Sequence, residues 1–231
     1  MMSRALKVVL SSAGLGGIVS LLALVGPAGP GDQPASAWLS PARTAYAQSP
    51  AAPIRYRVVA ERSEARYLVR EQLAGLSFPN DAVGTTTAIE GSLAIDARGR
   101  VLPGDSRFTI DLRMLRSDEA RRDNYLRRNT LETDRYPHAV FVPSEVRGLP
   151  VPLPQTGTVS FDLVGDLTIR DATRRVTWEA SATIHGQDLS VQAKTAFRFA
   201  DFALRVPRVS SVLSVEDTIR LEIALLLRRS P

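Results

Sequence analysis

Residues 159–184 read VSFDLVGDLTIRDATRRVTWEASATI, and this stretch decides the fold. Apolar residues stand at every second position before and after a polar turn at residues 170–173, with mostly polar residues between them. Such an alternation is typical of strands that bury one face. The stretch therefore predicts two long antiparallel strands joined by a short hairpin turn.

The alternation continues on both sides of this hairpin. The same pattern covers 65–70, 89–95, 108–114, 189–199 and 219–227, and a shorter apolar strand runs through Val140 and Phe141. A sheet with one continuous apolar face must close into a barrel or stack on a second sheet. Because the strands are long and the turns tight, we predict an all-β fold, an eight-stranded antiparallel up-and-down barrel. Side chains can just fill such an interior, or it can hold one slender ligand.

Two segments depart from the alternation. Residues 76–84 contain Pro79-Asn80-Asp81 and are predicted to form a loop. At 117–128 a serine that can cap a helix precedes two acid–base pairs at four-residue spacing, Asp118–Arg122 and Asp123–Arg127. This segment predicts one short helix that closes one end of the barrel.

The N-terminus has the features of an export signal. Arg4 and Lys7 precede an uncharged run over residues 8–25, and Ala45-Tyr46-Ala47 is a small-x-small site of the kind that signal peptidases cut. An uncleaved anchor is the alternative, because the run approaches a membrane span in length. Both interpretations place the folded part outside the cytoplasmic membrane, in the periplasm or the extracellular space.

We therefore divide the chain into a signal peptide or anchor over 1–47, a linker over 48–53 and one barrel domain over 54–229. The formal net charge of +5 is too small to indicate a nucleic-acid partner. The chain has no cysteine, which excludes disulfides and thiol chemistry. The oligomeric state stays open, a dimer included.

Three motifs resemble those of the YceI-like family. They are Arg122-Asp123-Asn124-Tyr125-Leu126 followed by Tyr136-Pro137 and Phe141, Gly165-Asp166-Leu167-Thr168-Ile169-Arg170 followed by Thr173 and Val176, and Asp201-Phe202-Ala203-Leu204. The resemblance covers roughly Arg55 to Arg228. It implies an extended lipocalin-like barrel that holds a long apolar chain, such as a polyisoprenoid or an isoprenoid quinone.

The chain departs from the family pattern in three places. Glu61-Arg62-Ser63-Glu64 stands where the family often has Asp-x-x-His-Ser, and Arg175 replaces a usual proline. Asp171 replaces the glycine of a turn, and aspartate can still adopt the left-handed conformation there. These departures affect turns and the first strand more than the interior.

The inward-facing residues of the predicted strands are the candidate ligand contacts. They are Tyr67, Phe108, Ile110, Leu112, Phe161, Leu163, Trp178, Phe197 and Phe199. Periodicity alone favours a solid core built from these side chains, since an apolar stripe is more often core than ligand site. The family resemblance favours a cavity.

A cluster of arginines surrounds the predicted helix and could attract an isoprenoid phosphate or an anionic membrane surface. The cluster consists of Arg113, Arg116, Arg121, Arg122, Arg127, Arg128 and Arg135. A solvated face with internal ion pairs is the simpler interpretation, because two of these arginines have acidic partners at helical spacing.

The sequence offers little for catalysis. His138 and His185 belong to no metal-binding cluster, and neither a nucleophile elbow nor a glycine-rich phosphate loop is present. We predict no catalytic residues, no metal and no cofactor, although a hydrolase that uses a carboxylate pair remains the weakest of three hypotheses.

The leading hypothesis is an exported carrier or store for an isoprenoid-type lipid. The alternative is a ligand-free structural or partner-binding barrel at the cell surface. That alternative predicts a filled interior and an exposed apolar patch at the proline-rich loop 148–157 or at 204–212.

Overall fold

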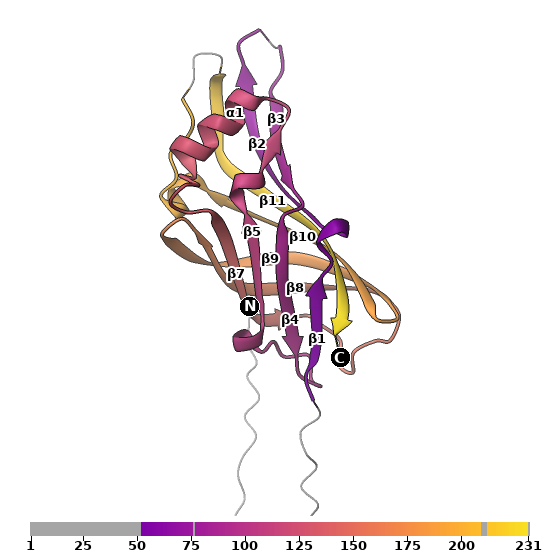
Figure 1. The fold of residues 1–231 in the computed structure, drawn as a ribbon. Helices are drawn as coiled ribbons and strands as arrows, with labels where there is room; N and C mark the ends of the chain where they lie inside the picture. Colours follow the sequence, from indigo (N-terminus) through magenta and orange to yellow (C-terminus); the bar gives the residue numbers. More distant parts are fainter. Residues whose placement is uncertain (1–51, 76, 209–211, 231) are drawn as a thin grey trace, which may run out of the picture. The chain divides into compact units, whose positions relative to one another are not determined.

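The computed structural model describes residues 52–75, 77–208 and 212–230 of the chain (Figure 1). These residues belong to one compact unit, Gln48–Pro231. The predicted leader over 1–47 and most of the predicted linker lie outside the described residues. Within the described ranges, no helix is long and apolar enough to cross a membrane.

Strands make up most of the unit. They are β1 Ile54–Val58, β2 Glu64–Leu73, β3 Asn80–Thr86, β4 Ile89–Ile95, β5 Arg107–Asp111, β6 Arg116–Ser117, β7 His138–Arg147, β8 Gly157–Ile169, β9 Ala172–His185, β10 Asp188–Arg198 and β11 Val212–Ser230. The helix α1 spans Ala120–Tyr125 and continues into a π-helical turn at Leu126–Thr130. Short 3-10 turns lie at Ala60–Arg62, Pro103–Asp105, Leu112–Met114 and Phe199–Phe202.

The strands close into one antiparallel barrel. The order around it is β1-β4-β5-β7-β8-β9-β10-β11, and β11 pairs back onto β1. Three passes of the chain are interrupted by short breaks: β1 is followed by β2, β3 by β4, and β5 by β6. The strands β2, β3 and β6 pair in the order β11-β2-β3-β6. Counting each broken pass once gives eight passes, so the predicted eight-stranded up-and-down barrel is confirmed.

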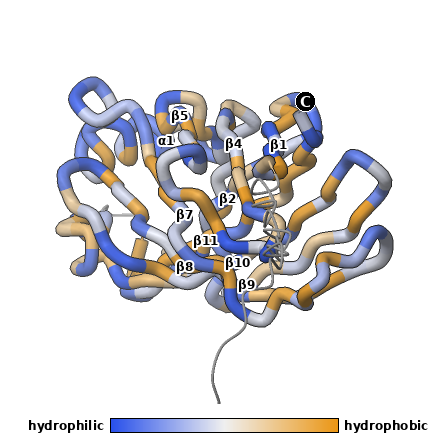
Figure 2. The backbone as a smooth tube through the Cα atoms, turned by 90° about the horizontal axis from the view of Figure 1, so that it is seen from below, coloured by the Kyte–Doolittle hydropathy of each residue, from blue (hydrophilic) through white to orange (hydrophobic). Residues whose placement is uncertain are grey.

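The predicted hairpin over residues 159–184 forms, with its turn between Ile169 and Ala172. β8 and β9 pair from Gly157 opposite Ile184 to Ile169 opposite Ala172, with Leu163 opposite Trp178. The alternation of hydrophobic and hydrophilic residues along the strands is visible in Figure 2. One detail was wrong: Arg170, and not Asp171, takes the left-handed conformation in the turn, with φ of 56°.

The prediction of a loop over 76–84 was also wrong in part. The turn residues end at Pro79, and β3 begins at Asn80 because it finds partners on both sides, β2 and β6. Gly84 sits inside this strand. A Cβ at Gly84 would overlap the ring of Tyr67, so the glycine makes room for an inward-facing aromatic side chain on β2.

The helix forms in the predicted region with different details. Ser117 belongs to β6, and Glu119 caps α1 by accepting a hydrogen bond from the Arg121 N–H at 3.0 Å. The Asp118–Arg122 pair forms. The predicted Asp123–Arg127 pair does not, because the buried Asp123 carboxylate accepts hydrogen bonds from the hydroxyl and the N–H of Ser117 instead.

Candidate functional site

A cavity of about 270 Å³ lies inside the barrel, and every pass of the chain contributes to its wall. Its volume is just below the roughly 300–1,000 Å³ typical of ligand pockets, which suits a slender molecule. The wall is aliphatic and aromatic with few polar groups. The lining residues with polar side-chain atoms are Tyr56, Arg66, Tyr67, Thr86, Thr130 and Trp178. The interior is therefore hollow and apolar, not a solid core.

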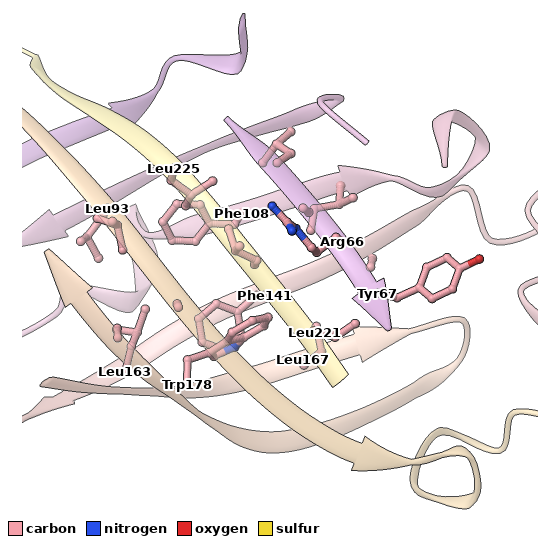
Figure 3. A pocket seen from close by; sticks show the side chains of 18 of the residues that line it. Arg66, Tyr67, Leu93, Phe108, Phe141, Leu163, Leu167, Trp178, Leu221 and Leu225 are labelled. Atoms are coloured by element: carbon pink, nitrogen blue, oxygen red, sulfur yellow. The ribbon is translucent and has the colours of Figure 1, made fainter. Parts of the chain in front are cut away.

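All nine residues predicted as ligand contacts line this cavity: Tyr67, Phe108, Ile110, Leu112, Phe161, Leu163, Trp178, Phe197 and Phe199. Their contact with a ligand stays a prediction. Sequence reasoning missed Phe141, whose ring packs edge-to-face on Trp178 with the centroids 5.9 Å apart (Figure 3). The sequence pattern could have indicated Phe141, because it lies two residues after Ala139 on the same strand and therefore on the same face, and Ala139 also lines the cavity.

The helix end of the barrel is the end at which α1 lies, uppermost in Figure 1. Leu126 and Thr130 of the π-helical turn that continues α1, and Leu131 directly after it, line the cavity together with Leu115. This segment therefore lies across that end of the cavity, which is where the sequence analysis placed it.

The loop end is the opposite end, at which residues 148–156 join β7 to β8. Leu149, Leu153 and Pro154 of this loop line the cavity. The side chains of Leu149 and Leu153 also lie against the turn at Gly99, since they would be 3.3 and 3.5 Å from a Cβ there. The apolar residues of the loop are thus divided between two faces. Leu149, Leu153 and Pro154 face inward, whereas Pro150, Val151 and Pro152 are exposed and form a short apolar stretch at the surface.

The second expected apolar patch, at 204–212, also has both inward-facing and exposed residues. Leu204 is buried and lines the cavity, whereas Val206 and Leu213, just beyond the range, are exposed. Residues 209–211 lie outside the described residues. The largest exposed apolar side chain in the described ranges is Phe78, at the tip between β2 and β3.

A buried ion pair ties the helix end together. The Arg122 guanidinium on α1 donates to the Glu71 carboxylate on β2 at 2.8 Å, and their side chains are only 18% and 7% exposed. Arg122 also bonds Asp118, so one cation is shared between two carboxylates. A strand that contributes to the cavity wall is thereby joined to the helix across its end.

Tyr67 lies beside this ion pair. Burial raises the pKa of its phenol to about 12; the Arg122 charge opposes the shift, whereas Asp123 and Glu71 add to it. Its buried hydroxyl has no hydrogen-bond partner among the described residues. In Figure 3 the hydroxyl points away from the group formed by Phe141, Trp178 and Leu163. The phenol therefore stays protonated at neutral pH and can donate a hydrogen bond.

Most of the arginines around α1 are occupied. Arg113 pairs with Asp111, Arg116 donates to two backbone carbonyls, and Arg127 donates to the Leu115 carbonyl. Arg135 lies over the ring of Tyr136. Arg121 and Arg128 are exposed and form no ion pair within the described ranges. The arrangement supports a solvated face with internal pairs more than an anion site.

The described residues contain no group of three or more histidine, cysteine or acidic side chains placed to hold a metal ion. The two buried acidic residues are both engaged, Glu71 with Arg122 and Asp123 with Ser117. The arrangement offers no free carboxylate pair beside the cavity in the described part of the chain.

Comparison with known sequences finds a match to the YceI-like domain over residues 56–227. A UPF0312 protein of Pseudomonas putida is 28% identical over 137 residues, which cover 55% of this chain and 66% of the relative. A UPF0312 protein of Pseudomonas fluorescens is 28% identical over 151 residues, with 62% and 71% covered. The chain thus spans just under two thirds of the Pseudomonas putida protein.

Three solved structures have a similar fold. A polyisoprenoid-binding domain from Saccharophagus degradans, implicated in plant cell wall breakdown, has a TM-score of 0.60 at 14% identity, covering 76% of this chain and 98% of that one. Burkholderia cenocepacia BcnA has a TM-score of 0.55 at 16% identity, with 73% and 98% covered. The Campylobacter jejuni YCEI protein has a TM-score of 0.54 at 16% identity, with 69% and 91% covered. At these identities the likeness shows the fold alone.

Proposed function

The chain belongs to the YceI-like family, and from that premise we propose that its barrel carries or stores one long apolar lipid of the isoprenoid type. One observation carries the proposal: an apolar cavity extends from the segment after α1 at the helix end to Leu149 and Leu153 at the loop end. The polyisoprenoid binding of the Saccharophagus degradans domain supports the same ligand class.

The physical chemistry of the cavity favours such a ligand. Each Å² of apolar surface removed from water contributes roughly 25 cal/mol, so a chain that buries about 400 Å² gains roughly 10 kcal/mol before the cost of association. No polar group has to be desolvated along most of the wall. A linear hydrocarbon chain can therefore bind firmly with few directional contacts.

We propose further that the protein acts outside the cytoplasmic membrane, as a binding protein and not as an enzyme. The charged start, the uncharged run over 8–25 and the Ala45-Tyr46-Ala47 site support export. The intact mass of the protein recovered from the periplasm or the medium tests this. Cleavage after Ala47 is expected, and retention of the full mass in the membrane fraction would indicate an anchor.

Ligand extraction tests the carrier proposal. Natively purified protein is extracted with organic solvent, and the extract is analysed by mass spectrometry. Ala182→Phe places a ring inside the cavity at a lining position on β9, and it is expected to abolish the bound lipid. The matched control is Ala196→Phe, the same change at an exposed position on β10, and it is expected to retain the lipid.

The proposal fails if the wild-type protein never carries an apolar molecule and binds none of a set of added polyprenols and isoprenoid quinones. Equal occupancy of the two alanine variants would also contradict it, because it would place the lipid outside the cavity.

A second candidate function is partner binding at the cell surface. Phe78, Val151 and Leu213 are 80%, 65% and 68% exposed, and such apolar side chains are available for contact. A protein partner whose binding survives Trp178→Arg, a change that disrupts the cavity wall, would favour this candidate.

A further inference from the structure

The loop end carries an apolar stretch on its outer side. Pro150, Val151 and Pro152 of the loop between β7 and β8 are exposed, and Val151 is 65% exposed. The neighbouring Leu149 and Leu153 line the cavity. One short loop thus separates the cavity from the surroundings, with apolar side chains on both of its faces.

Positive charge accumulates at the same end. The register of β1 with β4 and β11, and of β8 with β9, brings five segments together there: 52–57, 92–107, 144–160, 183–190 and 226–230. They hold eight arginines and four carboxylates. Each carboxylate forms an ion pair with an arginine of the same end, in Asp96–Arg100, Asp105–Arg55, Glu145–Arg147 and Asp188–Arg228.

The other arginines of the loop end have no carboxylate partner. They are exposed and form no ion pair within the described ranges: Arg57, Arg98, Arg107 and Arg229. Arg98 lies beside the apolar loop, because a Cβ on the next residue, Gly99, would be 3.3 and 3.5 Å from the side chains of Leu149 and Leu153. An apolar stretch next to uncompensated cations is the combination that binds an anionic membrane surface.

The helix end has larger exposed apolar side chains but a different pattern of charge. Phe78 and Leu213 are 80% and 68% exposed. Glu216 and Asp217 follow Leu213 closely in the chain, are exposed and form no ion pair within the described residues. They offset the exposed arginines of that region, which include Arg208. Charge complementarity to an anionic surface therefore favours the loop end.

The chain that precedes the barrel also joins it at the loop end. Ile54, the first residue of β1, lies opposite Ile95, the last residue of β4. If the uncharged run over 8–25 is retained as an anchor, the link to the membrane therefore reaches the barrel at the end that carries the unpaired arginines.

We propose that the loop end docks on an anionic phospholipid surface. Val151 and its flanking prolines enter the interface, and the four unpaired arginines contact lipid phosphates. This inference goes beyond the proposed function, because it assigns the surface at which a carrier takes up or delivers its lipid. Docking at this end places the membrane against the loop that covers the cavity, so that a lipid has only this loop to pass.

Co-sedimentation with vesicles tests the proposal. The protein recovered from the periplasm or the medium is mixed with vesicles of phosphatidylglycerol and phosphatidylcholine in equal amounts, or of phosphatidylcholine alone. Wild type is expected to bind the anionic vesicles and to be released by salt. Arg98→Gln should weaken binding about fivefold, the usual worth of one basic residue near such a surface. Val151→Asp should weaken it about tenfold, because apolar burial is lost.

The matched controls are equivalent changes at the helix end. Arg121→Gln removes an exposed arginine on α1, and Phe78→Asp removes the most exposed of the large apolar side chains. Both are expected to change binding by less than about twofold. Three results would overturn the proposal: no binding to anionic vesicles, equal binding to both kinds of vesicle, or a larger loss in Phe78→Asp than in Val151→Asp.

A single label shows which end meets the bilayer, also in a chain that keeps its leader as an anchor. The chain has no cysteine, so Val151→Cys and Phe78→Cys each provide one site for an environment-sensitive dye. With anionic vesicles, the emission of the dye at 151 is expected to shift to shorter wavelength, and that at 78 to stay unchanged. A shift at 151 that grows with protein concentration without vesicles would indicate a second copy of the chain and contradict the membrane contact.

The docking surface and the carrier function can fail separately. Protein that carries an extractable lipid but binds no vesicles would leave the carrier function standing and remove only the docking surface. Protein that docks as described but never carries an apolar molecule would retain the docking surface and overturn the carrier function.

Discussion

The two ends of the cavity are closed by different physical means. At the helix end a helical segment lies across the barrel and is joined to β2 by the buried Glu71–Arg122 ion pair. At the loop end the residues 148–156 cover the cavity through the apolar side chains of Leu149, Leu153 and Pro154. Arg55 and Asp105, which form an ion pair between β1 and the turn Pro103–Asp105, are 44% and 43% exposed.

This difference indicates how each end responds to change. A buried ion pair is directional, and removal of one partner leaves an uncompensated charge, so the helix end should either hold or fail as a unit. Apolar contacts from a loop are non-directional and can be lost one at a time. We therefore expect the helix end to dominate stability and the loop end to govern the exchange of ligand.

The largest expected effect comes from breaking the buried pair. Glu71→Ala should lower the free energy of unfolding by about 3 kcal/mol, because the largely buried Arg122 keeps only the exposed Asp118 and a long hydrogen bond to the Ser117 hydroxyl as partners. The control Asp105→Ala breaks the exposed pair near the loop end and should cost less than about 1 kcal/mol. Urea denaturation measures both. Equal losses would show that the two ends do not differ.

A second test uses pH. The phenol of Tyr67 has a pKa raised to about 12, so the folded state binds its proton more tightly than the unfolded state does. Its contribution is fully present below the unfolded pKa near 10 and is lost as the pH rises through 12. We expect the stability of wild type relative to Tyr67→Phe to decrease by roughly 2 kcal/mol between pH 9 and pH 12. A difference that does not change with pH would place the phenol in contact with solvent.

A third test concerns the rate of ligand release. Leu153→Ala shortens a side chain that covers the loop end, and the dissociation rate of a bound lipid should rise about tenfold, or about 1.4 kcal/mol. Leu131→Ala removes the same atoms at the helix end, where the ion pair keeps the segment in place, and should change the rate by less than about threefold. Stopped-flow transfer to vesicles measures both rates. A larger effect of Leu131→Ala would reverse the assignment of the two ends.

The sequence predicted the barrel because the alternation in β8, β9 and β10 needs no tertiary information. It missed β3 because Pro79-Asn80-Asp81 is a strong turn signal, whereas the pairing of β3 with β2 and β6 is tertiary. The sequence analysis also missed the Glu71–Arg122 pair, because the two residues are 51 positions apart in the chain. Helical spacing indicates only Asp118 as a partner for Arg122.

The lining residues could be named from periodicity, but the hollow between them could not. A period of two fixes which side chains face inward, whereas a cavity depends on how far the opposite walls of the closed barrel stand apart. The sequence also could not predict that the polar atoms of Tyr67, Thr130 and Trp178 would be buried without a hydrogen-bond partner among the described residues. Whether a donor has a partner depends on neighbours contributed by other strands.

The smallest expected effect concerns the backbone near the helix end. Ala203 ends the turn Phe199–Phe202 in the left-handed conformation, with φ of 51° and ψ of 30°, just before the cavity-lining Leu204. A Cβ is unfavourable in that conformation, so Ala203→Gly should raise the free energy of unfolding by about 0.5 kcal/mol, after the entropy that glycine adds to the unfolded chain is subtracted. Ala200→Gly, an exposed position of the same turn without a positive φ, should instead lower it by a similar amount. Thermal denaturation of both variants gives the sign of each change. If both variants have a lower free energy of unfolding than wild type, the backbone at Ala203 is not strained. The Glu71–Arg122 ion pair would then be the main stabilising feature at the helix end.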